Sequence, residues 1–319
     1  MDIRRYTPEK ADEWNRFVAQ SKNGTFLFDR RYMDYHADRF QDHSLMFYRK
    51  GRLCALLPAN VHDGTLYSHQ GLTYGGLITD EKATTAMVME AFEVLNQQLH
   101  AEGIAHVVYK PTPWIYHRMP AEEDLYAIFA VCHGSLIARD VSSAILRTPR
   151  PPFTESRRSG MRKAVNAGIS ISVCEHAAEH PDLETFWHIL NDNLWKKHGT
   201  HPVHSFEELR LLASRFPDNI RLYTAKQNDT MLGGTLVYET SQVVHTQYIS
   251  ASSEGKRLGV LDLLFDFLIH KKYADAHCID FGKSTSTSDC ILNSSLIFQK
   301  EGFGGRAVCY DTYEWNTEK

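Results

Sequence analysis

The order of strands and helices in the last third of the chain constrains the fold most. His245–Ser250 alternates as a strand does, and Val260–Tyr273 has the apolar spacing of an amphipathic helix. Cys278–Phe281 is a short apolar strand, and Leu292–Lys300 is a second helix. A β-α-β unit with Gly259 at the entrance of its helix can hold an anionic group on free backbone amides. A phosphate-bearing donor is therefore the leading hypothesis for this region.

Length and composition indicate a globular protein with two domains. A chain of 319 residues is long enough for two ordinary cores, and 43% hydrophobic and 23% charged residues are typical of globular proteins. The formal net charge of −4 provides no general basic field for nucleic acids. Thr148–Pro152 contains prolines that neither a helix nor a central strand tolerates, so we expect domains at 1–148 and 149–319.

Both halves predict strands flanked by helices. In residues 1–148 the helical segments are Pro8–Gln20, Tyr32–Phe40 and Ala83–Glu102, and the strand segments are Phe26–Phe28, Leu45–Tyr48, Leu53–Leu57 and Ala105–Tyr109. In residues 149–319, helices at Glu155–Ala167, Leu183–Leu194 and Phe206–Phe216 accompany strands at Ile169–Val173, Ile220–Ala225 and Gly234–Tyr238. The expected fold class is α/β (α+β), with a mixed central sheet flanked by helices in each half.

Three further patterns bear on location and metals. The N-terminus leads into a polar helix, and no run approaches the roughly 18 apolar residues of a membrane span, so we expect a cytoplasmic protein. The six cysteines are scattered, which indicates reduced and mostly buried side chains. His198, His201 and His204 recur every third residue, but Gly199 and Pro202 break any helix that would align them. We therefore expect no metal.

The segment Glu254–Gly259 has two interpretations. As a pyrophosphate cradle, Gly259 would let the backbone approach, the amides of residues 260–262 would point at the anion, and Arg257 would add positive charge. As an ordinary connection, it would simply precede a helix. Single glycine loops are common, so this loop alone favours the ordinary connection.

Two motifs together resemble a known family. Arg257–Gly259 precedes the first helix, and Asn293 opens the second, which ends in Lys300 followed by Phe303 and a glycine. The pair resembles the GNAT acyltransferase superfamily, whose R/Q-x-x-G-x-G/A loop is shortened here. It resembles more closely the two-domain, FemAB-like branch related to the Fem-type aminoacyltransferases. Fem-type enzymes carry Phe-Lys followed by Phe-Gly at this place. In this chain Lys300 and Phe303-Gly304 match, and Gln299 replaces the aromatic residue before the lysine.

The basic helix at Glu155–Ala167 and the segment Ser68–Gly76 extend the resemblance over nearly the whole chain. It implies two tandem GNAT-like domains, with the acceptor side in residues 1–148 and the donor-binding, catalytic side in residues 149–319. It also implies acetyl-CoA or another acyl-CoA as co-substrate, with no permanently bound cofactor. The acceptor would be a small molecule, a sugar or a cell-envelope precursor.

Acyl transfer requires a deprotonated nucleophile, a polarised carbonyl and a protonated leaving group. In GNAT enzymes the donor thioester lies where two parallel strands splay apart, which the resemblance assigns to His245–Ser250 and Cys278–Phe281. Lys300 would stabilise the oxyanion or protonate the leaving group; its alternative is a solvated lysine in a last helical turn. The residues that the resemblance implies for donor binding are Arg257, Leu258, Gly259, Val260, Leu261, Ile249, Ser250 and Asn293.

The candidate base or orienting carboxylate is Asp280, at the C-terminal end of a buried strand. It is equally suited to cap the Ser/Thr-rich turn that follows. On the neighbouring strand, alternation places His245 and Gln247 on one face and Tyr248 on the other. Only one face can line the cleft, and we favour His245 with Gln247.

Three other residues are candidates for substrate binding. Arg162 lies on the basic helix and can meet a local phosphate. His69 and Gln70 lie in a glycine-rich polar segment of the first half that can face a cleft. Their alternative is a simple hairpin crossing, which we prefer.

Three functions from two classes remain. The leading hypothesis is N- or O-acyl transfer from an acyl-thioester to an amine or hydroxyl. The runner-up is aminoacyl transfer from charged tRNA to a cell-wall precursor, which the acidic net charge and the lack of an obvious coiled-coil arm disfavour. The non-enzymatic alternative is a degenerate fold that acts as a binding or regulatory module. It is favoured by the shortened loop and by the lack of the tyrosine that GNAT enzymes often carry as general acid near the place of Lys300.

Overall fold

The computed structural model describes residues 1–286 and 290–318. Inter-residue contacts divide the chain into two units: unit 1 comprises Met1–Asp140 with Cys309–Lys319, and unit 2 comprises Val141–Val308. The division falls inside two long strands, β8 (Ser135–Leu146) and β14 (Arg306–Asn316), rather than at the proline-rich Thr148–Pro152. Each unit is mixed α/β, as the sequence predicts.

Unit 1 contains two sets of paired strands. One sheet has the order β1-β2-β3-β6, and the other set has the order β4-β5-β7-β14. The strand bounds are β1 (Asp2–Arg5), β2 (Leu45–Arg49), β3 (Arg52–Leu57), β4 (Asn60–His62), β5 (Thr65–Tyr67), β6 (Ile78–Thr79) and β7 (His106–Tyr109). The helices are α1 (Ala11–Gln20), α2 (Arg30–Met33), α3 (Thr85–Ala101) and α4 (Glu123–Ala130), with short 3-10 turns η1 (Pro8–Lys10), η2 (Phe26–Phe28), η3 (Asp34–His36) and η4 (Trp114–Tyr116).

Local sequence explains most of unit 1. Lys50 and Gly51 both have positive φ angles, so the β2–β3 hairpin has the two-residue turn that the sequence predicts. The hydroxyl of Thr84 caps α3 by accepting the amide of Met87. The strand expected at Phe26–Phe28 is wrong, because the amide of Phe28 donates to the carbonyl of Thr25 and closes a 3-10 turn.

Unit 2 is built on one sheet with the order β8-β13-β12-β11-β10-β9. Its pairs are antiparallel except β12 with β13, which are parallel. The strand bounds are β9 (Ile169–Cys174), β10 (Ile220–Gln227), β11 (Thr230–Glu239), β12 (Val243–Ala251) and β13 (Cys278–Lys283). The helices are α5 (Glu155–Asn166), α6 (Asp182–His198), α7 (Phe206–Arg215), α8 (Ser253–Leu258), α9 (Val260–Phe267) and α10 (Ser294–Gly302), with a 3-10 turn η5 (Ala177–Glu179) and a π-helical turn η6 (Leu268–Lys272).

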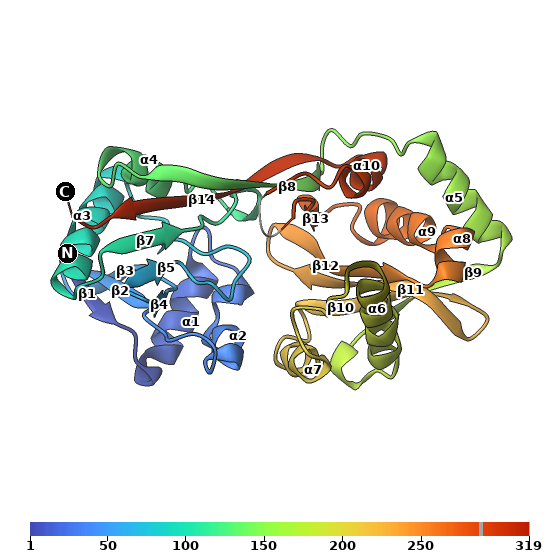
Figure 1. Cartoon of the computed structure of the whole chain (residues 1–319), viewed down its shortest axis with the longest axis horizontal. Coiled ribbons are helices and arrows are strands. Elements are labelled where there is room, and N and C mark those ends of the chain that lie inside the picture. The colour runs from blue at the N-terminus through green and yellow to red at the C-terminus, as the bar shows by residue number, and fades with distance from the viewer. Residues whose placement is uncertain (287–289, 319) are drawn as a thin grey trace. The chain divides into compact units, whose positions relative to one another are not determined.

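Helices cover both faces of the unit 2 sheet. In Figure 1, α5, α8 and α9 lie on one side and α6 and α7 on the other. Phe265 of α9 packs in a core cluster with Val237 of β11 and Phe281 of β13. On the opposite face Phe186 of α6 lies against β11 so closely that a Cβ on Gly234 would be 3.1 Å from its ring. The helices cover much of both faces, so a site in unit 2 is expected where the sheet is left uncovered between them.

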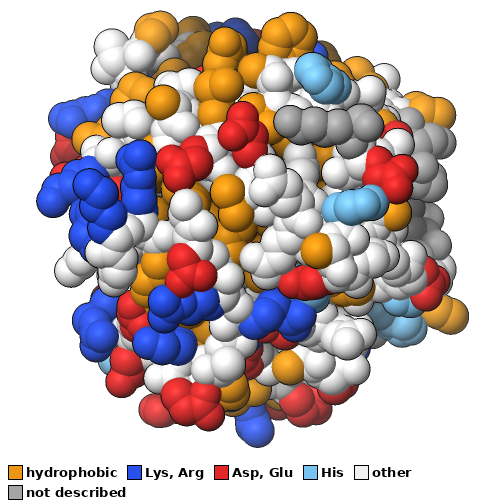
Figure 2. All heavy atoms as spheres, turned by 90° about the vertical axis from the view of Figure 1, so that its left-hand side faces the viewer, with side chains coloured by type: hydrophobic (Ala, Val, Ile, Leu, Met, Phe, Trp, Pro, Cys, Tyr) orange, Lys and Arg blue, Asp and Glu red, His pale blue; other side chains and the backbone are white. Residues whose placement is uncertain are grey.

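The surface charge and the lengths of the helices bear on binding to nucleic acids and membranes. Figure 2 shows basic and acidic side chains interspersed over one face of the molecule. Across residues 1–286 and 290–318, every helix is too short or too polar to traverse a lipid bilayer.

Candidate active site

The parallel strands β12 and β13 part after three residue pairs. Their register joins Val243 to Cys278, Val244 to Ile279 and His245 to Asp280. β12 then continues to Ala251 and β13 to Lys283 beyond the last of these pairs. The two strands that the resemblance assigned to the donor site are thus parallel neighbours whose pairing ends at His245 and Asp280.

A buried carboxylate lies at this point of separation. The side chain of Asp280 is fully buried, and its Oδ1 accepts hydrogen bonds from the Ser142 hydroxyl of β8 and, at 3.1 Å, from the amide of Gly282. Its Oδ2 lies 2.8 Å from Nδ1 of His245. Because an ionised carboxylate only accepts, Nδ1 carries the proton and the lone pair of the neutral ring is on Nε2. The His245 side chain is 14% exposed, so a substrate can approach it.

A β-bulge changes the faces expected on β12. Val237 pairs with Thr246 and the adjacent Leu236 pairs with Tyr248, so Gln247 is the extra residue of the bulge. Paired residues share a face, and the bulge therefore places His245 and Tyr248 on the same face. The expectation that Tyr248 lies opposite to His245 is wrong, because strict alternation was assumed.

Two contacts fix the far end of β12 against its surroundings. The Tyr248 hydroxyl lies 2.6 Å from Nδ1 of His204, and burial raises the pKa of Tyr248 to about 12. The Ser250 hydroxyl accepts a hydrogen bond of 2.8 Å from the side-chain amide of Asn193 on α6. Tyr248 is therefore a neutral phenol at physiological pH.

Lys300 of α10 lies at the end of β13. It is 5% exposed, and its Nζ donates hydrogen bonds of 2.7 Å to the carbonyl oxygens of Gly282 and Lys283. Burial lowers the pKa of Lys300 to about 8, against a smaller opposing effect of Asp280. The alternative of a solvated lysine in a last helical turn is wrong.

The start of α9 differs from the expected cradle. Residues Ser253–Leu258 form the short helix α8 rather than a loop, and the Arg257 guanidinium pairs with Glu254 within it. The amide of Asp262 already donates to the carbonyl of Gly259. Gly259 has a φ of +75° and lies against α5, because a Cβ there would be 2.5 Å from the carbonyl oxygen of Gly160. The start of α9 is thus packed against protein.

Asp262 adds negative charge to this packed helix start. Its carboxylate Oδ1 lies 2.8 Å from the Arg157 guanidinium of α5, and the side chain is largely buried. An acid in the first turn competes with an incoming phosphate for the positive end of the helix dipole. The Asp262 amide is already bonded to the Gly259 carbonyl and so does not support a phosphate site here. Phosphate binding stays a prediction for Arg257, Leu258, Gly259, Val260 and Leu261.

Comparison with known proteins identifies the type of domain. Residues 154–287 match the family model described as an acetyltransferase (GNAT) domain. Residues 154–287 therefore correspond to a GNAT acetyltransferase domain, which is called the GNAT domain below. A search among curated proteins finds no significant match to the sequence.

Solved structures share the fold of the whole chain. The structure of FemX has a TM-score of 0.70 at 12% identity, over 99% of this chain and 97% of that one. L-PGS from Bacillus licheniformis has a TM-score of 0.61 at 12% identity, over 99% and 93%. A tandem GNAT protein from the clavulanic acid biosynthesis pathway has a TM-score of 0.52 at 10% identity, over 100% and 99%. The expected fold class of two tandem GNAT-like domains is therefore confirmed.

The remaining candidates of the GNAT domain have local partners. Asn293 is the N-cap of α10, because its Oδ1 accepts the amide of Leu296 at 3.1 Å. Arg162 is an exposed side chain paired with Glu155 on the same helix. Ile249 packs at the edge of the core cluster that contains Phe265. These positions explain why each residue type is present, and their roles in binding stay predictions.

His69 and Gln70 lie in unit 1. His69 is buried with a φ of +101°, and burial lowers its pKa to about 3, so its ring is neutral. Gln70 exchanges two hydrogen bonds with Asn60, one through its amide and one through its side chain. Gln70 also lines a cavity of about 670 Å³ that is bounded by Arg39 and His62. Both residues therefore lie among polar groups of unit 1, and their role in substrate binding stays a prediction.

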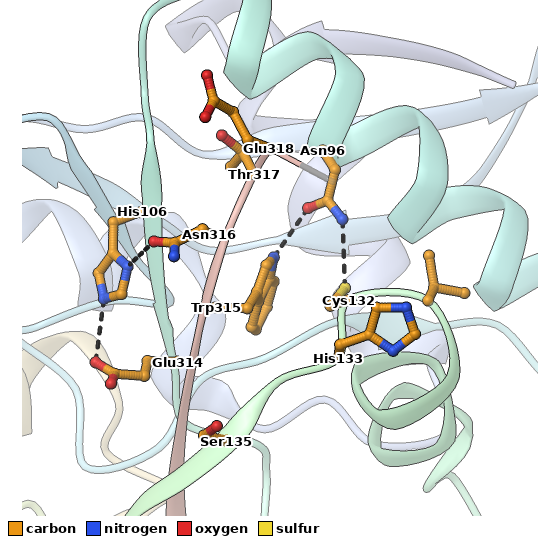
Figure 3. Close-up of a pocket in the computed structure, with 11 residues that line it drawn as sticks. Asn96, His106, Cys132, His133, Ser135, Glu314, Trp315, Asn316, Thr317 and Glu318 are labelled. Atoms are coloured by element: carbon orange, nitrogen blue, oxygen red, sulfur yellow. Dashed lines mark hydrogen bonds and ion pairs between the residues drawn. The ribbon is translucent and has the colours of Figure 1, made fainter.

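Unit 1 contains a second cavity, of about 310 Å³ (Figure 3). Asn96 accepts from the indole of Trp315 at 2.9 Å and donates to the sulfur of Cys132 at 3.5 Å. His106 lies 3.1 Å from both Asn316 and Glu314. Burial raises the pKa of Cys132 to about 11, which keeps it a thiol. The cavity is lined by both polar and apolar side chains, and its cysteine is a poor nucleophile.

Sequence reasoning missed two parts of the site. Ser142 belongs to β8, a strand that the sequence did not predict, and reaches Asp280 across 138 positions of chain. Gly282, which the expected strand Cys278–Phe281 leaves out, is part of β13 and has a φ of +73°. A Cβ at Gly282 would be 3.1 Å from the His245 ring, so its lack of a side chain admits the histidine. A glycine two residues after the Asp of an apolar strand was the one available signal.

Proposed function

We propose that the GNAT domain transfers an acyl group from an activated thioester or ester to the amine or hydroxyl of a small molecule, sugar or cell-envelope precursor. One observation carries the proposal: the buried Asp280 carboxylate and the partly exposed His245 ring lie in contact where the parallel pairing of β12 and β13 ends. Acyl transfer needs a base beside a polarised carbonyl, and the separation of two parallel strands exposes main-chain amides next to that base.

His245 acts as the general base in this proposal. Asp280 holds the ring through Nδ1, which leaves Nε2 to take the proton of the acceptor amine or hydroxyl as it attacks the carbonyl carbon. The positive charge that develops on the ring is stabilised by the adjacent carboxylate. Ser142 and the amide of Gly282 hold that carboxylate in place from the other side.

Lys300 stabilises the oxyanion or protonates the leaving group in this proposal. An ammonium has three donors, and two of them bind the carbonyls of Gly282 and Lys283. The third can bind the oxyanion of the tetrahedral intermediate or deliver a proton to the leaving sulfur or oxygen. A pKa lowered to about 8 suits a group that gives up a proton near neutral pH.

The donor distinguishes two candidate functions. Acyl-CoA is the donor that the GNAT resemblance implies. The packed start of α9, with Gly259 against Gly160 and Asp262 paired to Arg157, favours instead an aminoacyl ester donor as in the Fem-type branch. The fold shared with FemX over 99% of the chain is consistent with this second candidate.

The test measures donor binding and transfer together. A ligand at a hundred times its dissociation constant adds about 2.7 kcal/mol to the free energy of unfolding, which thermal melting detects. Stabilisation by acetyl-CoA or CoA, with acetylation of a pool of amine acceptors, would support the first candidate. Transfer of a labelled amino acid from charged tRNA to a cell-wall precursor, without a CoA effect, would support the second.

His245→Gln is the matched variant, because it keeps a polar side chain of similar size at a partly exposed position. It should retain donor binding and lose transfer. If neither donor binds wild type and no transfer is detected, the domain is a binding module and the proposal is wrong.

A further inference from the structure

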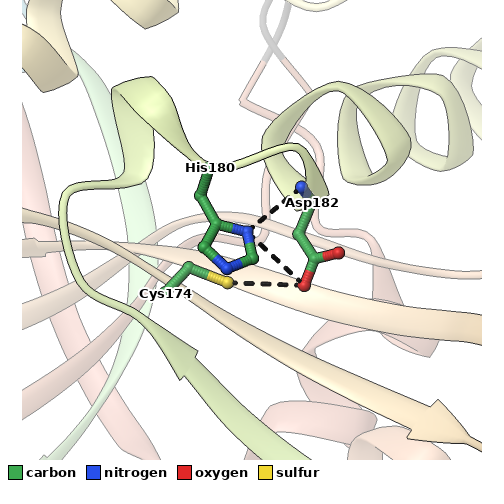
Figure 4. Close-up of side chains that lie close together, drawn as sticks. All are labelled: Cys174, His180 and Asp182. Atoms are coloured by element: carbon green, nitrogen blue, oxygen red, sulfur yellow. Dashed lines mark hydrogen bonds and ion pairs between the residues drawn. The ribbon is translucent and has the colours of Figure 1, made fainter. Parts of the chain in front are cut away.

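Three metal-ligating side chains converge away from the candidate active site. Cys174 ends β9, His180 follows the 3-10 turn η5, and Asp182 is the first residue of α6. Figure 4 shows the three side chains pointing toward one another. One ligand atom from each lies within 4.8 Å of the other two. All three belong to unit 2.

The spacing of these atoms fits a tetrahedral ion. The Sγ of Cys174 lies 3.5 Å from Oδ2 of Asp182, and the Nδ1 of His180 lies 3.7 Å from the same oxygen. Bonds of about 2.0–2.3 Å to a tetrahedral Zn²⁺ separate its ligands by about 3.3–3.6 Å. We propose that Cys174, His180 and Asp182 bind a divalent cation of the zinc class, contrary to the expectation of no metal, which considered only His198, His201 and His204. The His180 side chain is 38% exposed, so solvent can supply the fourth ligand.

Two of the three ligands are already in their metal-binding form. The Nδ1 of His180 accepts the amide of Asp182 at 3.2 Å, so it carries a lone pair that can be donated to an ion. The side chain of Asp182 is paired with the Lys226 ammonium, whose Nζ lies 2.9 Å from Oδ1 and 2.7 Å from Oδ2. A bound ion would take the place of the Asp182 amide at Nδ1 of His180.

Cys174 must lose its proton when the ion enters. The residue is 1% exposed, and burial with the nearby Asp182 raises the pKa of its thiol to about 12. Only a cation in contact with the sulfur compensates that cost, so one proton leaves for each ion bound.

Lys226 is the competitor for this site. Its ammonium contacts the Oδ2 that the ion needs, so the apo state uses a lysine as its cation. An entering ion takes Oδ2 and leaves Lys226 on Oδ1. Repulsion between the ammonium and the ion weakens binding, and removal of the ammonium should tighten it.

The ion would tie a strand to a helix. Cys174 is the last residue of β9, and the helix that begins at Asp182 buries Leu183 and Phe186. The same helix provides Asn193 to the Ser250 hydroxyl on β12. A cation at the start of α6 therefore stabilises the layer on one face of the sheet without touching the His245–Asp280 pair.

The experiment titrates the metal-free whole chain with Co²⁺ and Zn²⁺. Co²⁺ bound by a thiolate gives a near-ultraviolet charge-transfer band, and displacement by Zn²⁺ removes the band. We expect one ion per chain, a melting temperature that rises with added Zn²⁺, and a band that persists in Cys309→Ser, the control at an exposed cysteine. Cys174→Ser should abolish the band, and the half-exposed His180→Ala should weaken Co²⁺ binding about tenfold or more.

Lys226→Met separates a built site from chance binding to surface histidines. It removes only the competing charge, so Co²⁺ affinity should increase while the band keeps its wavelength. Absence of a thiolate band in wild type, or a band that survives Cys174→Ser or disappears in Cys309→Ser, would overturn the proposal. So would weaker binding by a folded Lys226→Met.

Discussion

Two places in the GNAT domain carry the features that a donor site requires, and only one of them is open. At the end of the β12–β13 pairing, a buried carboxylate and a partly exposed histidine meet. At the start of α9, Gly259 lies against the backbone of Gly160. A helix N-terminus can bind an anion only where its amides are accessible, and α5 covers the start of α9.

Glycine occurs at both places for different reasons. Gly282 and Gly259 have nearly equal φ angles, +73° and +75°. A Cβ on Gly282 would meet the His245 ring at 3.1 Å, whereas a Cβ on Gly259 would meet the carbonyl oxygen of Gly160 at 2.5 Å. The first glycine makes room for a titratable side chain, and the second lets two helices approach.

Asp280→Asn should have the largest effect on this comparison. Without the carboxylate, His245 loses the partner that orients it and stabilises its charged form, so kcat/KM should fall about 10²–10⁴-fold. Turnover and thermal melting are measured together. Asp124→Asn is the control, because Asp124 of unit 1 is also a buried carboxylate and accepts a 2.6 Å hydrogen bond from Tyr109. Equal turnover in both variants would remove Asp280 from the mechanism.

Lys300 should make the free energy of unfolding change with pH in the alkaline range. Burial lowers the pKa of Lys300 to about 8 in the folded state, whereas an exposed lysine of the unfolded chain has an ordinary pKa of about 10.5, so between these values the unfolded chain holds a proton that the folded chain lacks. The free energy of unfolding should therefore rise with pH across this window, by about 3 kcal/mol in total. Urea denaturation at several pH values, with Lys300→Met subtracted, measures the effect.

A flat difference between wild type and Lys300→Met from pH 8 to 10.5 would contradict a buried ammonium. The subtraction matters because other groups titrate in the same range.

Gly259→Ala should destabilise the packed helix start rather than merely weaken ligand binding. The alanine must adopt a left-handed conformation and avoid the Gly160 carbonyl, so the free energy of unfolding should fall by about 1–3 kcal/mol. Gly168→Ala is the matched control: its φ is +72°, but no atom lies within 4 Å of its added Cβ. Equal losses in the two variants would show that the contact with Gly160 does not matter.

Arg257→Ala should have the smallest effect. The guanidinium is exposed and pairs with Glu254 within α8, so both the melting temperature and the donor affinity should match wild type. A large loss of CoA affinity in this variant would restore the start of α9 as the phosphate site.

Local patterns predicted most elements, and contacts between distant segments account for the errors. The strands His245–Ser250 and Cys278–Phe281 followed from periodicity. So did the helix expected at Leu292–Lys300, which the structure has at Ser294–Gly302. The bulge at Gln247 did not, because it depends on the register with β11. Neither did β8, whose Ser142 completes the Asp280 site, nor helix α8, where a glycine and a polar composition suggested a loop.

The last strand has a consequence for biosynthesis. Residues 309–319 belong to unit 1, and Trp315 fills the same cluster as Phe92 and Tyr109. The ribosome therefore releases all of Val141–Val308 before the first unit receives its final strand. Until then, a nascent chain exposes the β7 edge that β14 later pairs with, a surface on which chaperones act. A premature stop codon after Val308 would spare every residue of the GNAT domain and damage the unit that was translated first.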